Sequence, residues 1–229
     1  MPILLLCGWP IRGPVVDRQQ LHNGLDSLGL TIAEQGADNI ILYCRELLKW
    51  NRRMNLVARN TGPVEALEKH FLDSLTLLKI MLPAASAMTL LDVGTGAGFP
   101  GLVLAAVLPE LQVTLVEPRQ KRVAFLQHII RTLRLDNVHL FADRLENGAF
   151  GRGDFSYITS RAVANVDQFL AMVRHLAVVE TRVICMRGGN EKAVAAGRQT
   201  RGPWRQVQEV SFPLPWSKAA RLLLVFQKC

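Results

Sequence analysis

The chain of 229 residues is long enough to bury one substantial hydrophobic core. Its 49% hydrophobic and 20% charged residues exclude an intrinsically disordered protein. Lysine and arginine number 27 against 19 aspartate and glutamate residues, and the resulting net charge of +8 favours a polyanionic partner such as nucleic acid. A basic enzyme that binds no polyanion is the alternative.

Cysteine usage and hydropathy argue against several other classes of protein. The four cysteines are far apart and include no C-x-x-C pair, so we expect reduced thiols, no metal site and a cytoplasmic location. We expect Cys185, inside an apolar run, to be a buried small residue rather than a nucleophile. The apolar opening of the chain lacks the basic segment of a signal peptide, and no apolar run reaches the ~20 residues that span a bilayer.

The first 83 residues divide into a tail and a helical extension. Residues 1–20 contain several prolines and glycines without sustained periodicity, which predicts a flexible tail. Apolar residues then recur at helical spacing over residues 38–50 and 63–82, and Pro83 is the expected stop of the second run. We predict two amphipathic helices within an extension that covers residues 21–83.

Residues 84–229 alternate short β-branched or leucine-rich runs with helical segments, as in a parallel α/β sheet. The predicted strands cover residues 89–93, 112–117, 138–142, 155–160, 182–186, 206–212 and 221–227. The predicted helices between them cover residues 101–108, 121–133 and 166–176. Seven strands that end in a hairpin fit a doubly wound, Rossmann-like sheet of the class I methyltransferase type.

Three alternating glycines follow the first predicted strand directly: Gly94, Gly96 and Gly98. Glycine permits positive φ and lets a ligand approach the backbone, and the Pro100-Gly101 pair after it suits the start of a helix. Glu117 ends the next strand about 23 residues after Gly94, the place from which a doubly wound fold presents a carboxylate to ribose hydroxyls. The spacing predicts an adenosine-containing ligand.

The identity of that ligand has more than one interpretation. Residues 96–101 also satisfy G-x-G-x-x-G, which makes an NAD-dependent oxidoreductase an alternative. Asp92 lies two residues before the first glycine, where its charge would repel a pyrophosphate and attract a cationic amino-acid group. This favours S-adenosylmethionine. A tight turn that holds no ligand is the third interpretation.

Several segments jointly resemble the bacterial small-subunit (16S) ribosomal RNA guanine-N7 methyltransferases, the glucose-inhibited division protein B family, over about residues 20–228. They are KWNRRMNL at 49–56, HFLDSL at 70–75, the turn at 92–101, EPRQKRVAFL at 117–126 and SRA at 160–162. The resemblance implies methyl transfer from S-adenosylmethionine to N7 of a guanine in 16S rRNA. It also implies cofactor contacts from five residues: Gly94, Phe99, Leu145, Glu146 and Arg161.

To these five we add Gly96 and Glu117, which belong to the turn and to the strand that follows it. Family members often carry aspartate where this chain has Glu117, a conservative departure. The family pattern around Leu145 and Glu146 has an arginine, a small or apolar residue and a glutamate, which Arg144 and these two residues match. The resemblance does not extend to residues 1–20.

The reaction that the resemblance implies does not require a general acid or base. Guanine N7 presents an in-plane lone pair and no proton, so methyl transfer needs alignment more than a general base, and we assign no catalytic residue. Arg161 follows a strand at the ligand-binding edge of the sheet, where it pairs with the cofactor carboxylate or stabilises a flipped guanine. His70 and Asp73, at i and i+3, are interpreted as an anchor of their helix rather than as a catalytic pair.

Basic residues gather in three groups for which phosphate contact and a solvated surface are the competing interpretations. The groups are Arg45, Lys49, Arg52, Arg53 and Arg59; Arg119, Lys121, Arg122, Arg131 and Arg134; and Arg198, Arg201 and Arg205. Trp204, in the third group, either stacks on a base or packs in the core. We expect a monomer that binds 16S rRNA or the small ribosomal subunit, and neither DNA nor a membrane. A non-catalytic RNA-binding protein on the same fold is the remaining alternative.

Overall fold

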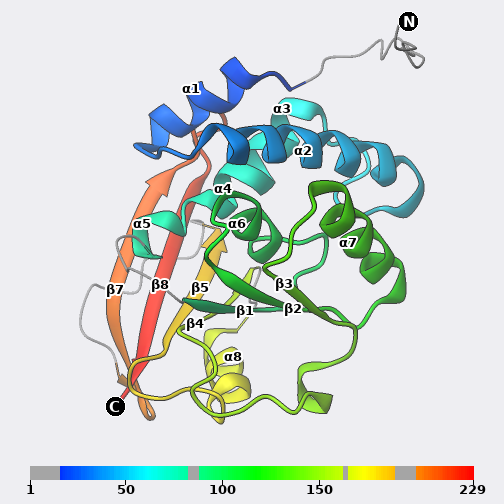
Figure 1. Cartoon of the computed structure of the whole chain (residues 1–229). Coiled ribbons are helices and arrows are strands. Elements are labelled where there is room, and N and C mark those ends of the chain that lie inside the picture. Colours follow the sequence, from blue (N-terminus) through cyan, green and yellow to red (C-terminus); the bar gives the residue numbers. More distant parts are fainter. Residues whose placement is uncertain (1–15, 82–87, 162–164, 189–199) are drawn as a thin grey trace, which may run out of the picture.

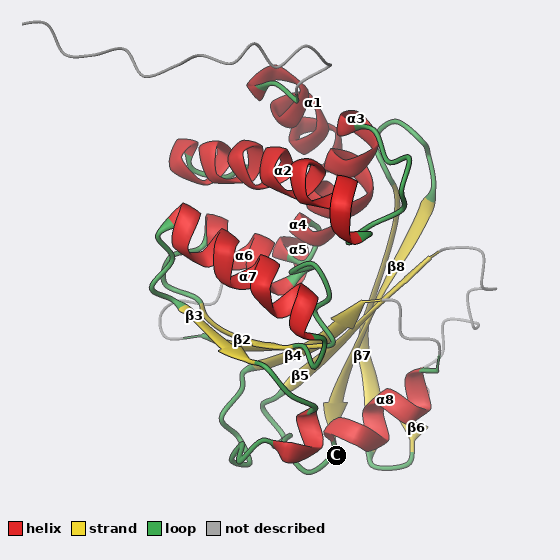
Figure 2. Cartoon of the chain, turned by 90° about the vertical axis from the view of Figure 1, so that its right-hand side faces the viewer, coloured by secondary structure: helices red, strands yellow, loops and turns green. Residues whose placement is uncertain are grey.

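The computed structural model describes residues 16–81, 88–161, 165–188 and 200–229, and it shows a central sheet covered by helices on both faces (Figure 1). The helices before the sheet are α1 (Arg18–Leu28), α2 (Glu34–Met54), α3 (Pro63–Ala66), the π-helix η1 (Leu67–Leu72), α4 (Asp73–Leu75) and α5 (Leu78–Met81). Those within it are α6 (Gly101–Val107), α7 (Gln120–Leu133), the 3₁₀-helix η2 (Leu145–Asn147) and α8 (Val166–Val173). Helices α1, α2, α6 and α7 lie on one face and α8 on the other (Figure 2).

The sheet has the order β3-β2-β1-β4-β5-β8-β7-β6. Its strands are β1 (Thr89–Val93), β2 (Gln112–Val116), β3 (Val138–Phe141), β4 (Tyr157–Arg161), β5 (Arg182–Gly188), β6 (Thr200–Arg201), β7 (Trp204–Pro213) and β8 (Ala220–Lys228). The first five strands in this order are parallel, and β8 and β7 close the sheet as an antiparallel hairpin. The predicted Rossmann-like sheet is confirmed, and the two-residue β6 is added to its seven strands.

The N-terminal extension differs from the prediction in two ways. Helix α1 begins at Arg18, three residues inside the predicted tail, because the Asp17 side chain accepts a hydrogen bond of 2.7 Å from the amide of Gln20 and caps the helix. The helix predicted over residues 63–82 is interrupted by the π-helix, which a regular 3.6-residue pattern does not reveal. Residues 1–15 and Pro83, on which parts of those predictions fall, lie outside the described residues.

Two hydrophobic clusters hold the layers together. One lies between the extension and the sheet and includes Ile40 and Leu47 of α2, both fully buried. The other lies under α8 and includes Cys185, whose burial confirms its predicted structural role and raises the pKa of its thiol to about 12. Trp204 belongs to this second cluster and is 2% exposed, so it is a packing residue and not a platform for a base. Among the described helices none has the length and hydropathy to cross a bilayer.

Candidate active site

The glycine turn lies at the carboxyl end of β1, between the sheet and α6. The amides of Gly94 and Thr95 donate to the carbonyl of Val116 at 2.9 and 3.1 Å, which ties the turn to the end of β2. Gly94 and Gly96 have φ of +70° and +63°, and a Cβ added to Gly94 would meet no atom within 4 Å. The outer surface of the turn is therefore open backbone, as expected where a ligand approaches it.

Glu117 directly follows β2 and stands behind this turn. Its carboxylate is 2% exposed and accepts hydrogen bonds from the amide of Gly96 at 3.0 Å and from the amide of Arg119 at 2.9 Å. The Arg122 guanidinium lies 3.5 Å away. A carboxylate has about four lone-pair positions, so these three contacts fix its orientation and leave about one position, on a side chain that is nearly buried in this structure.

Asp92 has a different role from the one expected. Its side chain is fully buried beneath the turn, where Oδ2 accepts from the Thr95 hydroxyl at 2.6 Å and from the Gly101 amide at 2.8 Å. It therefore braces the turn from behind instead of contacting a ligand. Since this carboxylate already occupies an amide at the start of α6, the usual pyrophosphate position of a dinucleotide-binding turn is partly filled, which still argues against NAD.

The buried carboxylate of Asp92 makes stability depend on pH. Burial raises its pKa to about 6 from an ordinary 3.8, although Thr95 and Gly101 oppose the shift, and its Oδ1 atom has no hydrogen-bond partner among the described residues. A carboxyl group whose pKa is higher in the folded than in the unfolded state stabilises the fold fully at pH values below its unfolded-state pKa. That stabilisation is lost as the pH rises through its folded-state pKa. The Asp92→Asn variant cannot titrate. Between pH 4 and 7 the wild type should lose roughly 2 kcal/mol of unfolding free energy relative to this variant.

Urea unfolding of both proteins across this pH range checks that prediction. The difference between the two curves cancels the titration of groups common to both proteins, such as His70. Parallel pH profiles for the wild type and Asp92→Asn would show that Asp92 titrates normally in the folded state.

Aromatic contacts join the N-terminal extension to the turn through Phe99. The Phe99 ring is stacked on Tyr43 of α2, with centroids 5.9 Å apart and planes 6° apart, and lies edge-on to Phe71 at 5.3 Å. The Tyr43 hydroxyl donates to the carbonyl of Ala97 in the turn, and a Cβ on Gly98 would collide with that hydroxyl. Phe99 as a whole residue is only 2% exposed, so its ring belongs to the packed wall of the site.

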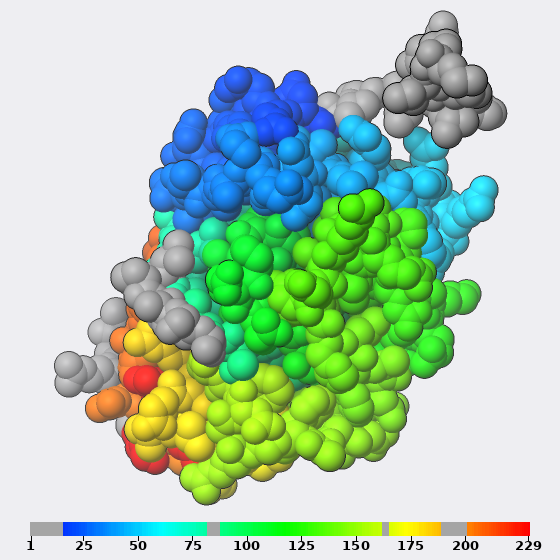
Figure 3. Space-filling view, in the orientation of Figure 1, coloured from blue at the N-terminus to red at the C-terminus, as the bar shows by residue number. Residues whose placement is uncertain are grey.

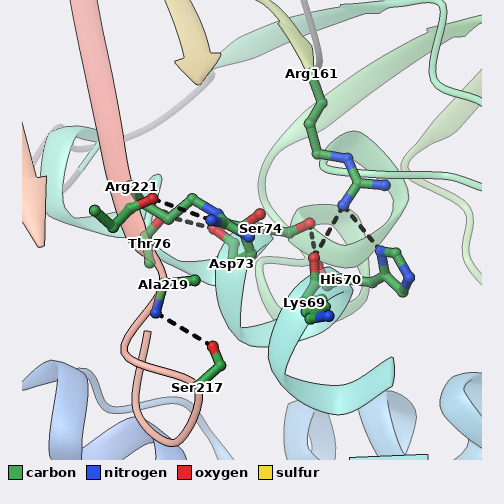
Figure 4. A network of polar contacts seen from close by, with 10 residues as sticks. Lys69, His70, Asp73, Ser74, Thr76, Arg161, Ser217, Ala219 and Arg221 are labelled. Carbon is green, nitrogen blue, oxygen red and sulfur yellow. Dashed lines mark hydrogen bonds and ion pairs between the residues drawn. The ribbon is translucent and has the colours of Figure 1, made fainter. Parts of the chain in front are cut away.

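Arg161 and His70 lie over the same aromatic ring from the other side of the site. The guanidinium carbon of Arg161 is 4.9 Å from the Phe99 centroid, and the His70 ring stacks on Phe99 at 5.0 Å. Arg161 Nη1 lies 3.1 Å from His70 Nδ1 and donates to the carbonyl of Lys69 at 3.2 Å (Figure 4). Burial and the charge of Arg161 lower the pKa of His70 to about 3, so its neutral ring can accept from Arg161.

The π-helix that carries His70 is anchored to the β7–β8 hairpin. Asp73 pairs with Arg221 at 3.1 Å, and the Ser74 hydroxyl donates to the carbonyl of His70 at 2.6 Å (Figure 4). Glu68 accepts hydrogen bonds from the amides of Trp216 and Ser217 in the hairpin turn. Burial raises the pKa of Asp73, while the charge of Arg221 opposes the shift. Asp73 therefore anchors its helix through Arg221, and not through the i, i+3 pair with His70 that the spacing suggested.

The structure therefore brings together the turn residues, Glu117 and Arg161, and it adds Tyr43 and His70. Leu145 and Glu146 follow β3 in η2, where the Leu145 side chain enters the cluster under α8 and Glu146 is exposed. The spacing of His70 and Asp73 predicted only a helix anchor. The signal that could have placed His70 near the site was the HFLDSL segment, which belongs to the family resemblance. Tyr43 left no comparable signal, because its contact with Ala97 joins residues 54 apart.

The strand order, with an open glycine turn after β1 and a carboxylate after β2, defines a Rossmann-like class I methyltransferase fold. Solved structures agree. A SAM-dependent methyltransferase from Aquifex aeolicus superposes with a TM-score of 0.52 at 18% identity, over 71% of this chain and 92% of that one. An MtNAS mutant in complex with S-adenosylmethionine superposes with a TM-score of 0.54 at 17% identity, over 93% of this chain and 84% of that one.

Sequence comparison then gives the family. Residues 37–222 match the GidB family model, described as rRNA small subunit methyltransferase G. Ribosomal RNA small subunit methyltransferase G of Desulfotalea psychrophila is 40% identical over 213 residues, which are 91% of this chain and 97% of that protein. The protein of the same name from Myxococcus xanthus is 39% identical over 212 residues, 91% of this chain and 96% of its own length. The chain belongs to the GidB family.

Proposed function

We propose that this protein transfers a methyl group from S-adenosylmethionine to N7 of a guanine in 16S ribosomal RNA, as a cytoplasmic monomer. The observation that carries the proposal is the open backbone of Gly94 beside the carboxylate of Glu117, which the amide of Gly96 holds in place. Membership of the GidB family and the relatives' name, ribosomal RNA small subunit methyltransferase G, support the RNA substrate.

The residues present fit S-adenosylmethionine. The open backbone at Gly94 suits a ligand that lies on the turn, and Glu117 keeps about one lone-pair position for a ribose hydroxyl. We assign cofactor contacts to Gly94, Gly96 and Phe99, with Leu145 and Glu146 completing the site. When bound, the cofactor supplies a methyl group activated by its sulfonium.

Arg161 supplies the fixed positive charge of the site. The Lys69 carbonyl and neutral His70 hold its guanidinium over Phe99, where it is available to a carboxylate of the cofactor or to the guanine O6. Guanine N7 needs no deprotonation, so the contribution of these residues is orientation and water exclusion rather than proton transfer. No general base is assigned.

Labelled methyl transfer tests the proposal. Small-subunit RNA and intact subunits from cells that lack the protein should accept label from S-adenosylmethionine, whereas RNA from cells that contain it, already methylated, should accept much less. Calorimetry should show binding of S-adenosylmethionine and none of NAD. Binding of NAD alone would support the oxidoreductase, and RNA binding without cofactor affinity or turnover would support a non-catalytic RNA-binding protein.

A further inference from the structure

Helices α2 and α7 pack side by side and form one continuous surface (Figures 2 and 3). The rings of Trp50 and His128 lie 4.9 Å apart, and the ring of Trp50 is 5.5 Å from Phe125. His128 Nε2 is also 2.6 Å from the Glu46 carboxylate. These contacts define a seam between the two helices whose edges are exposed to solvent.

On the α2 edge, basic side chains border the seam. Glu46 and Trp50 both contact α7, and residues three apart on a helix lie on the same face. Lys49 and Arg53 follow them by three residues, so both lie on the α7 side of α2, and both are exposed. Arg45 and Arg52 are exposed as well.

The α7 edge carries matching charges. Lys121 lies one turn before Phe125, and Arg131 lies three residues after His128, and both are exposed. We call Lys49, Arg53, Lys121 and Arg131 the basic seam. Among the described residues no carboxylate lies within 4 Å of Arg53, Lys121 or Arg131.

Glu46 offsets the charge of Lys49 but not that of the other three residues of the basic seam. Its burial favours the neutral form, but hydrogen bonds from His128 and Lys49 outweigh burial and lower its pKa, so it is a carboxylate already engaged within the seam. Lys49 is 3.3 Å from it. Three unpaired cations therefore face solvent along the seam, and a polyanion is the chemistry that complements them.

The basic seam begins at the rim of the cofactor site. The Arg119 amide and the Arg122 guanidinium, which flank Lys121 in the sequence, both contact Glu117. From this rim the 14 residues of α7 extend about 21 Å, long enough for several nucleotides.

The third basic group lies elsewhere. The Arg201 side chain of β6 forms an ion pair with Asp167 at 2.8 Å. Arg205 of β7 lies opposite Gln227 of β8, and Gln227 lies opposite Arg182, the first residue of β5. That is the amino end of the parallel strands, opposite the glycine turn. Arg198 lies outside the described residues.

We propose that the basic seam binds the phosphate backbone of the RNA substrate and leads the strand to the cofactor site. This inference rests on the proposed function for the identity of the polyanion. It assigns phosphate contact to these four members of the first two basic groups and to none of the third.

The test compares the double variant Arg53→Gln/Arg131→Gln with the control Arg174→Gln/Arg205→Gln, which removes two exposed arginines near the opposite edge. Binding of 16S rRNA is measured as a function of salt concentration. Each lost phosphate contact reduces the magnitude of the slope of log K against log salt concentration by about 0.7 to 0.9. The slope of the seam variant should therefore be smaller in magnitude by roughly 1.4 to 1.8, and its affinity for 16S rRNA should be about tenfold lower. The control should match the wild type, and S-adenosylmethionine affinity should be unchanged in both.

A wild-type salt slope in the seam variant, or an equal loss in the control, would overturn the inference. Methyl transfer by the wild type, measured in parallel, separates the two proposals. If the wild type methylates RNA and the seam variant binds normally, only the seam is wrong. If RNA binding depends on the seam and no methyl is transferred, the seam stands and the proposed reaction is wrong.

Discussion

Replacing Gly96 with aspartate should reduce the affinity for S-adenosylmethionine by about a hundredfold or more. The backbone at Gly96 has φ of +63°, and the new side chain would extend toward Arg122 Nη1, which lies 3.6 Å from the Cβ position. A second carboxylate there would compete with Glu117 for Arg122 and occupy the open face of the turn. Calorimetry of cofactor binding measures the effect.

Gly29→Asp is a matched control for this substitution. Gly29 also has φ of +63°, and a Cβ there would meet no atom within 4 Å. Both variants therefore carry the same charge and a similar backbone penalty, but only one alters the turn. Equal cofactor affinity in Gly96→Asp and Gly29→Asp would place the cofactor away from the glycine turn.

Replacing Arg161 with alanine should lower the rate of methyl transfer by on the order of a hundredfold, with a smaller effect on folding. The variant removes the guanidinium over Phe99 together with its bonds to Lys69 and His70, and it leaves the buried core intact. Single-turnover kinetics at saturating cofactor, combined with urea unfolding, separates the two effects.

Arg221→Ala provides the comparison for charge loss alone. Arg221 pairs with Asp73 in the same polar network as Arg161 and approaches from β8 (Figure 4), whereas the cation–π contact with Phe99 is made by Arg161. Its removal should cost stability and little activity. An equal loss of activity in Arg161→Ala and Arg221→Ala would make Arg161 a structural residue only.

Much of the fold could be predicted because its signals are local. The alternation of strands and helices, the three glycines and the acid at Glu117 each lie within a short segment, and all seven predicted strands are present. Helix α1 was not predicted, because the prolines and glycines before it masked the cap at Asp17. Trp204 could not be assigned until its burial was known.

The site was less predictable because its contacts join distant segments. Tyr43 reaches Ala97 across 54 residues, and Arg161 reaches His70 across 91. The role of Asp92 was misjudged because sequence spacing placed it near the ligand but did not show that its side chain lies beneath the turn. The resemblance supplied Arg161 and Phe99, and the structure supplied the contacts that orient them.

The most direct test of the proposed reaction is mass spectrometry of nucleosides from 16S rRNA treated with the protein and S-adenosylmethionine, using RNA from cells that lack the protein. The account predicts 7-methylguanosine, formed by the wild type and much reduced with Gly96→Asp. Methylation of a different atom or base would contradict the assignment to guanine N7, and no methylation of naked RNA or intact subunits despite cofactor binding would contradict the proposed substrate.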